Sequence, residues 1–100
     1  MNSKTRYYRW RLRKVISEAQ KEAEEFKVMA SPKRPPWHLE LTYYFDAYIF
    51  VLKDGVYIQF AGYGILSPPQ KCRDIEEAID KVAKWMTEHP SRWRIGWEKI

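Results

Sequence analysis

Residues 37–66, WHLELTYYFDAYIFVLKDGVYIQFAGYGIL, hold more than half of the aromatic residues of the chain and decide its fold. From Leu39 to Val51 the odd positions are apolar or aromatic, which is the period-two pattern of a β-strand with one face toward a core. Asp46 interrupts this pattern with a residue that strands disfavour. We therefore predict a turn or a bulge at Asp46, giving two strands or one bent strand.

A second break, Asp54-Gly55, predicts a β-hairpin. A two-residue turn needs positive φ at its central positions, and glycine adopts positive φ without steric cost. The turn predicts three cross-strand pairs: Lys53 with Val56, Val51 with Ile58, and Ile49 with Phe60. The apolar members of these pairs form one face, which we expect to lie on the core.

The opposite face of this hairpin is also rich in apolar and aromatic residues, namely Tyr48, Phe50, Leu52, Tyr57 and Gln59. This is more apolar surface than a solvated sheet face requires. One interpretation is that another element or a second subunit covers the face. The other is that the rings are an exposed platform on which nucleic-acid bases stack.

Residues 3–28 show apolar side chains at spacings of three and four, from Tyr8 and Leu12 to Ala23 and Phe26, which predicts one long amphipathic helix. Six cations and no acid occupy its first turns. They are Lys4, Arg6, Arg9, Arg11, Arg13 and Lys14. This layout opposes the helix macrodipole, which favours acids at the N-terminus. Helical spacing directs Arg6, Trp10 and Arg13 outward, with Arg9 and Lys14 at the flanks.

These six cations account for the basic character of the chain. The protein has 18 basic and 13 acidic residues and a net charge of +5. Without the six, 12 bases face 13 acids, which is a net charge of −1. Such an asymmetry indicates an anionic partner that contacts one end of the protein.

The remaining segments complete a single domain spanning residues 1–100. We expect a Pro-rich linker at 29–36, the hairpin ribbon at 37–66, a helix at 74–88 with an Asp74–Glu77 capping box, and a C-terminal strand at 92–99. The predicted fold is α+β in two layers. An antiparallel sheet of three to four strands carries the long N-terminal helix and the second helix, in the order α-β-β-(β)-α-β.

No catalytic or ligand-binding motif is present in the sequence. Cys72 and the two histidines, His38 and His89, are not at metal-ligand spacing, and no nucleophile has an adjacent base. We expect a non-enzymatic protein without a cofactor. The single cysteine fits a reducing compartment, and no apolar run is long enough to span a bilayer, so we expect a soluble cytoplasmic protein.

The order helix, strands, helix resembles that of the double-stranded-RNA-binding domain, and the three-stranded sheet followed by a helix resembles the arm-binding domain of phage integrases. The first family places a lysine-rich cluster at the start of its second helix. Here that position reads Asp74-Ile75-Glu76-Glu77, which would repel phosphate. The resemblance concerns the order of elements only, and no family is assigned from it.

The leading hypothesis is a small, sequence-tolerant nucleic-acid-binding protein (DNA or RNA), in keeping with the size and composition of archaeal or viral and mobile-element proteins. The candidate site residues are Arg6, Arg9, Trp10, Arg11, Arg13, Lys14, Tyr48, Phe50 and Tyr57. Arginine and lysine would contact phosphate, and the rings would stack on bases. The alternative is a protein–protein interaction module. It would be a homodimer through the aromatic sheet face, or an accessory protein that binds an acidic partner, because aromatic residues and arginine also dominate interface hot spots.

Overall fold

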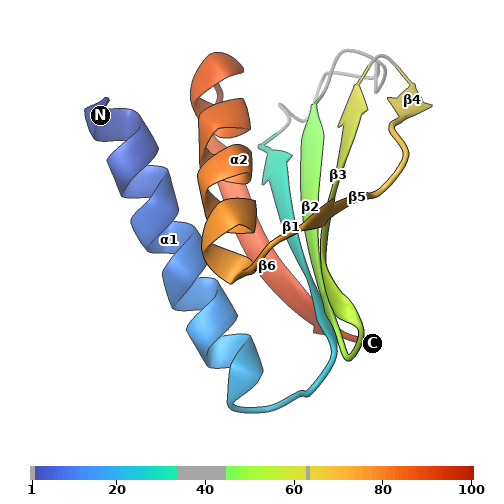
Figure 1. Ribbon diagram of the computed structural model, residues 1–100. Helices are drawn as coiled ribbons and strands as arrows, with labels where there is room; N and C mark the ends of the chain where they lie inside the picture. The colour runs from blue at the N-terminus through green and yellow to red at the C-terminus, as the bar shows by residue number, and fades with distance from the viewer. Residues whose placement is uncertain (1, 34–44, 63) are drawn as a thin grey trace.

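The computed structural model describes residues 2–33, 45–62 and 64–100, and shows two helices packed on one face of an antiparallel sheet (Figure 1). The elements follow one another as α1 (Ser3–Gln20), β1 (Phe26–Pro32), β2 (Asp46–Leu52), β3 (Gly55–Gly62), β4 (Ile65–Leu66), β5 (Gln70–Cys72), α2 (Ile75–Glu88) and β6 (Trp93–Lys99). The predicted two-layer α+β class is confirmed. Within the described residues the sheet has six strands, in place of the predicted three to four.

The strand order is β4-β3-β2-β1-β6, with β5 pairing β3 beyond the short β4 ladder. All of the pairs are antiparallel. The first strand in sequence, β1, thus lies inside the sheet between β2 and β6, and β6 lies at one edge (Figure 1).

The core lies between the helices and one face of the sheet. Strand β1 contributes Phe26, Val28 and Ala30, each at most 1% exposed. The helices contribute the residues of their apolar stripes, which are Leu12, Ile16 and Ala19 of α1 and Ala78, Ile79, Val82, Ala83 and Met86 of α2. The indole of Trp93 on β6 is also buried, and its Nε1–H donates to the Met86 carbonyl at 3.1 Å.

The prediction of one helix over residues 3–28 is wrong, because α1 ends at Gln20. At the end of α1, the Glu18 carbonyl accepts a hydrogen bond from the Lys21 N–H. The Ala19 carbonyl accepts from the N–H groups of Glu22 and Ala23. The chain then enters β1, whose burial alternates strictly. Residues 29–32 of the predicted linker therefore belong to a central strand, and residues 34–36 lie outside the described part of the chain. Proline is tolerated at Pro32 because this residue ends the strand.

The hairpin is present, but its register differs from the predicted one by two residues. Leu52 pairs with Gly55, Val51 with Val56, and Ile49 with Ile58. The loop residues are Lys53 and Asp54, and Gly55 takes the positive φ of 153° in the first paired position. Because side chains alternate with period two, a shift of two residues keeps the predicted faces. The predicted strand residues 37–44 lie outside the part of the chain that the structure describes.

Helix α2 begins as predicted. The Asp74 carboxylate accepts the Glu77 N–H at 2.8 Å, and the Glu77 carboxylate accepts the Arg73 N–H at 2.9 Å. The predicted strand at 92–99 is β6, Trp93–Lys99. None of the described helices is both long and apolar enough to cross a membrane.

Candidate nucleic-acid interface

The exposed surface of α1 carries two aromatic rings. Helix α1 buries Tyr8 and Leu12 on its core side, so Tyr7 and Trp10 point away from the sheet. Tyr7 is 52% exposed and Trp10 is 56% exposed. A tryptophan that is more than half exposed is unusual, because indole is a large apolar group that is normally largely buried. The exposure indicates a contact surface.

The two rings lie against each other and against cations of the same helix. The centroids of Tyr7 and Trp10 are 6.3 Å apart, with an interplanar angle of 28°. The Arg11 guanidinium lies 5.6 Å from the Tyr7 centroid, and the Lys14 ammonium lies 5.3 Å from the Trp10 centroid. Arg6, also exposed, precedes Trp10 by one turn. We call these five residues, Arg6, Tyr7, Trp10, Arg11 and Lys14, the α1 strip.

The cations of the α1 strip have no acidic neighbour in the described structure. Across residues 2–33, 45–62 and 64–100, no carboxylate lies within 4.0 Å of the charged groups of Arg6, Arg11 or Lys14. Arg11 is oriented by a bond from its Nη1 to the Trp93 carbonyl, 3.1 Å long. Its charge is therefore positioned without being neutralised, which leaves it available to an anion.

Two of the predicted phosphate ligands, Arg9 and Arg13, contact the other helix. Arg9 Nε lies 2.7 Å from Asp80 Oδ1. Arg13 donates twice to the Glu76 carboxylate, from Nη2 at 2.6 Å and from Nε at 3.2 Å. This hydrogen bond and the charge of Glu76 raise the pKa of Arg13. Both arginines thus have intramolecular carboxylate partners that a phosphate would have to displace.

The predicted aromatic residues of the sheet lie on the opposite side of the molecule from the helices. Tyr48 pairs with Gln59, and Phe50 with Tyr57, on the face that neither α1 nor α2 covers (Figure 1). The centroids of Tyr48 and Phe50 are 6.3 Å apart. The sheet itself separates these rings from α1. The predicted site is therefore divided over two surfaces.

This sheet face is shallowly hollowed and mostly apolar. One hollow of about 270 Å³ is lined by Phe50, Leu52, Asp54, Tyr57, Gln59 and Pro69. A second, of about 220 Å³, is lined by Lys27, Tyr48, Phe50, Gln59 and Leu66. The Lys27 ammonium lies 5.9 Å from the Tyr48 centroid and 3.8 Å from a Glu98 oxygen. The Tyr57 hydroxyl donates to the Asp54 carboxylate at 3.2 Å. The pKa of Tyr57 is raised, chiefly by desolvation and secondly by this hydrogen bond.

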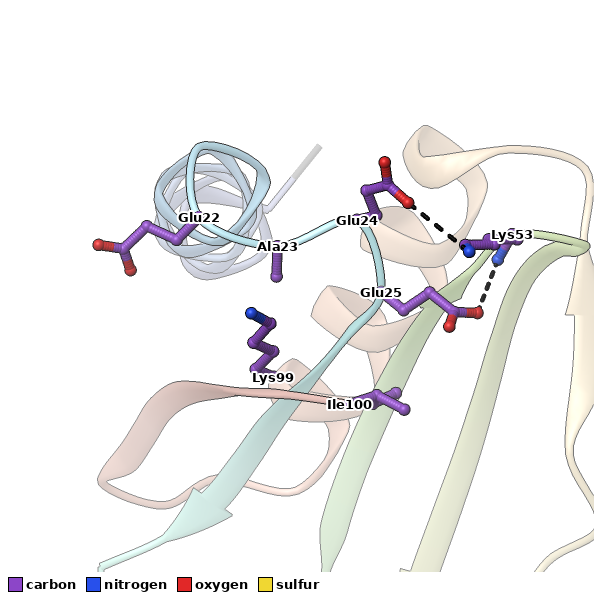
Figure 2. Close-up of a pocket in the computed structure, with 7 residues that line it drawn as sticks. All are labelled: Glu22, Ala23, Glu24, Glu25, Lys53, Lys99 and Ile100. Carbon is purple, nitrogen blue, oxygen red and sulfur yellow. Dashed lines mark hydrogen bonds and ion pairs between the residues drawn. The ribbon is translucent and has the colours of Figure 1, made fainter.

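A third hollow, of about 370 Å³, lies where α1 ends and β6 ends. Its walls are Glu22, Ala23, Glu24, Glu25, Lys53, Lys99 and Ile100. In Figure 2, Glu24 and Glu25 both extend toward Lys53. Glu25 accepts the Lys53 backbone N–H at 3.0 Å, and Glu24 lies 3.8 Å from the Lys53 ammonium. These carboxylates hold the hairpin turn against the start of β1, which is a structural role.

Residues with metal-ligating or nucleophilic side chains are dispersed in the described part of the chain. It contains no group of three or more His, Cys, Asp or Glu that could hold a metal ion. The Cys72 thiol is buried, and this burial raises its pKa. His89 packs between rings, 4.1 Å from the Trp85 centroid and 4.5 Å from the Phe45 centroid, and its Nδ1 lies 2.8 Å from the Trp85 carbonyl.

Sequence reasoning overlooked one member of the α1 strip, Tyr7. It precedes Trp10 by three positions, which is the spacing that places two side chains on one helix face. This spacing could have identified it.

Comparison with known proteins gave no match to a family model, to a curated protein or to a solved structure.

Proposed function

We propose that this protein binds nucleic acid through the α1 strip, without reading sequence. The observation that carries the proposal is the exposed Tyr7–Trp10 pair set among three cations that lack carboxylate partners in the described structure. Aromatic rings stack on bases of any identity, and Arg or Lys binds phosphate.

The charge distribution supports this proposal. The net charge of +5 arises in residues 4–14, and two of the six cations there, Arg9 and Arg13, are paired with α2. Of the others, Lys4, Arg6 and Lys14 are exposed and Arg11 lies half-buried beside β6, so a phosphate chain would meet positive charge over successive turns of α1. In such sequence-tolerant binding, phosphate contacts would supply most of the affinity.

The proposal is tested by fluorescence anisotropy of labelled oligonucleotides titrated with the wild-type protein and with Trp10→Ala and Tyr7→Ala variants. Stacking contributes about 1–3 kcal/mol per base, so each variant should weaken binding by about 5-fold or more. Lys84→Ala, at an exposed position of α2, is the matched control and should bind within about twofold of the wild-type. Absence of wild-type binding at low salt, or equal binding by the Trp10 variant, would refute the assignment.

A second candidate function is protein–protein interaction through the aromatic sheet face, and its support is that both helices pack on the other side. The partner would be a second copy or another protein, and Phe50 lines both hollows of this face. A Phe50→Ser variant should then lose an association that the Trp10→Ala variant retains. Sedimentation of the two variants separates this candidate from the first.

A further inference from the structure

Strand β6 leaves one side of its backbone unpaired in the described structure. It pairs with β1 along Trp93–Lys99, and among residues 2–33, 45–62 and 64–100 no strand pairs with its other side (Figure 1). Its residues Arg94, Gly96, Glu98 and Lys99 are exposed. A free edge of this length is a template for pairing with another strand.

Hydrogen bonds at both ends of β6 show which of its residues direct their backbone groups outward. The Lys33 N–H donates to the Arg92 carbonyl, and the Ile100 N–H donates to the Glu25 carbonyl. Even-numbered residues therefore bond toward β1, since the pattern alternates along an antiparallel ladder. The odd-numbered Trp93 agrees with this alternation, because its carbonyl accepts from Arg11 on the side of β6 that faces away from β1. Ile95 and Trp97 thus present their N–H and C=O groups at the free edge.

The sequence of β6 is self-complementary about Gly96. Arg94 and Glu98 are placed two residues before and after it, and Ile95 and Trp97 one residue before and after it. In an antiparallel pair of such strands with Gly96 opposite Gly96, each arginine faces a glutamate and each isoleucine faces a tryptophan. Opposite charges and aliphatic–aromatic pairs in register stabilise adjacent strands.

We propose that two copies of this chain associate by antiparallel pairing of their β6 strands about a two-fold axis at Gly96, forming one continuous sheet. Ile95 would exchange both backbone hydrogen bonds with Trp97 of the partner subunit, because these are the residues whose N–H and C=O groups point to the free edge. Arg94 would face the partner's Glu98 in the closer, non-hydrogen-bonded position. A Cβ built on Gly96 meets no atom of the described residues within 4 Å, so this face of the strand is open at the axis.

The neighbouring charges agree with this arrangement. Glu98 is 60% exposed although it lies 3.8 Å from the Lys27 ammonium, so one of its sides remains open to a second cation. A two-fold axis normal to the sheet places both α1 helices on the same side and antiparallel to each other. The first half of α1 is basic, whereas Glu18 lies in its last turn and Glu22 lies just after its end, so opposite charges would face each other across the axis. The proposal does not depend on nucleic-acid binding.

A charge-reversal series followed by sedimentation equilibrium tests the proposal. The wild-type should be a dimer that dissociates on dilution. In the Arg94→Glu dimer, the new glutamate of each subunit would face Glu98 of the partner subunit. This repulsion, which occurs at two places, should raise the dimer Kd by about tenfold or more. Lys84→Glu makes the same change of net charge on α2 and should leave Kd unchanged. Circular dichroism establishes that each variant is folded.

Mixing two variants makes the test specific to the register. Glu98→Arg alone should also weaken the dimer, because two arginines then face each other. An equimolar mixture of Arg94→Glu with Glu98→Arg should form heterodimers about as readily as the wild-type forms dimers, since every facing pair is again opposite in charge. A monomeric wild-type, a dimer insensitive to Arg94→Glu, or a dimer abolished by Phe50→Ser alone would each overturn the proposal.

Amide hydrogen exchange supplies an independent measurement. The N–H groups of Arg94 and Gly96 bond to β1 and should be protected at every protein concentration. Those of Ile95 and Trp97 should become protected only when the concentration is raised into the dimeric range. Concentration-independent exchange at Ile95 and Trp97 in a dimeric sample would place the interface elsewhere.

Discussion

The Arg13 guanidinium of α1 contacts the Glu76 carboxylate of α2 at two points, with an Nη2–Oε2 distance of 2.6 Å and an Nε–Oε1 distance of 3.2 Å. One turn earlier on α1, Arg9 contacts Asp80, and near its start the Thr5 hydroxyl lies 2.8 Å from the Thr87 hydroxyl. The helices are therefore antiparallel. The first turn of α1 adjoins the last turn of α2, which has no basic residue of its own. The negative end of the α2 dipole thus offsets the unfavourable position of the α1 cations.

The first prediction concerns stability. Replacing both Arg9 and Arg13 by Ala should lower the free energy of unfolding by about 0.5–1 kcal/mol, because partly exposed ion pairs each contribute a few tenths of a kcal/mol. Thermal denaturation should show a melting temperature lower by about 2–8 °C. The control variant, Arg6→Ala with Lys14→Ala, removes cations without carboxylate partners in the described structure and should leave the melting temperature unchanged.

The second prediction concerns salt. If Arg6, Arg11 and Lys14 each release a counterion on binding, the plot of log K against log salt should have a slope of about −2 to −3. Arg6→Ala should make this slope shallower by about 0.7–0.9 for every nucleic acid tested. Titrations at four salt concentrations measure both values. A slope near zero would exclude phosphate contacts as the source of affinity.

The third prediction concerns the start of α2. Asp74→Ala removes the acceptor of the Glu77 N–H and should lower the free energy of unfolding by about 1 kcal/mol, as measured by urea denaturation. Asp74→Asn keeps a side-chain oxygen at the cap, and should retain most of the stability. Equal loss in the two variants would mean that the charge, and not the hydrogen bond, stabilises this end.

The fourth prediction concerns Cys72 and pH. Burial raises its pKa, so the folded state favours the neutral thiol. The resulting contribution to stability is complete below the pKa of the unfolded thiol, about 8.5, and is lost as pH rises through that value and up to the folded pKa. Alkylation of the native protein should be much slower than that of the urea-unfolded chain between pH 7 and 9. Equal rates would show that the thiol is accessible.

Local sequence signals identified the elements whose ends are determined by local interactions. The cap at Asp74 marked the start of α2, and the alternation of Trp93, Ile95 and Trp97 marked β6. The boundary between α1 and β1 was missed because Phe26 fits two patterns. It continues the helical spacing from Ala19 and Ala23, and it begins the alternation of β1. Pairing of β1 with β2 and β6 decides between the patterns, and such long-range pairing has no local signal.

The same distinction applies to the candidate site. Helical spacing was sufficient to direct Arg6 and Trp10 outward. The ion pairs of Arg9 and Arg13 depend on how α2 docks, which the spacing within α1 does not contain. The separation of Trp10 from the sheet aromatics follows from both helices covering one face. A sequence pattern identifies the two faces of a strand without telling which is covered.

The central position of β1 has a consequence for how the chain folds. Phe26 pairs with Lys99, so forming the β1–β6 ladder joins two segments that are far apart in the sequence. Such closure is entropically costly and slow compared with forming the hairpin of β2 and β3, whose paired residues are close in sequence. During synthesis, β1 could pair with β6 only after β6 had emerged from the ribosome. Until then, the side of β1 that faces β6 in the finished protein would remain open to pairing with other chains.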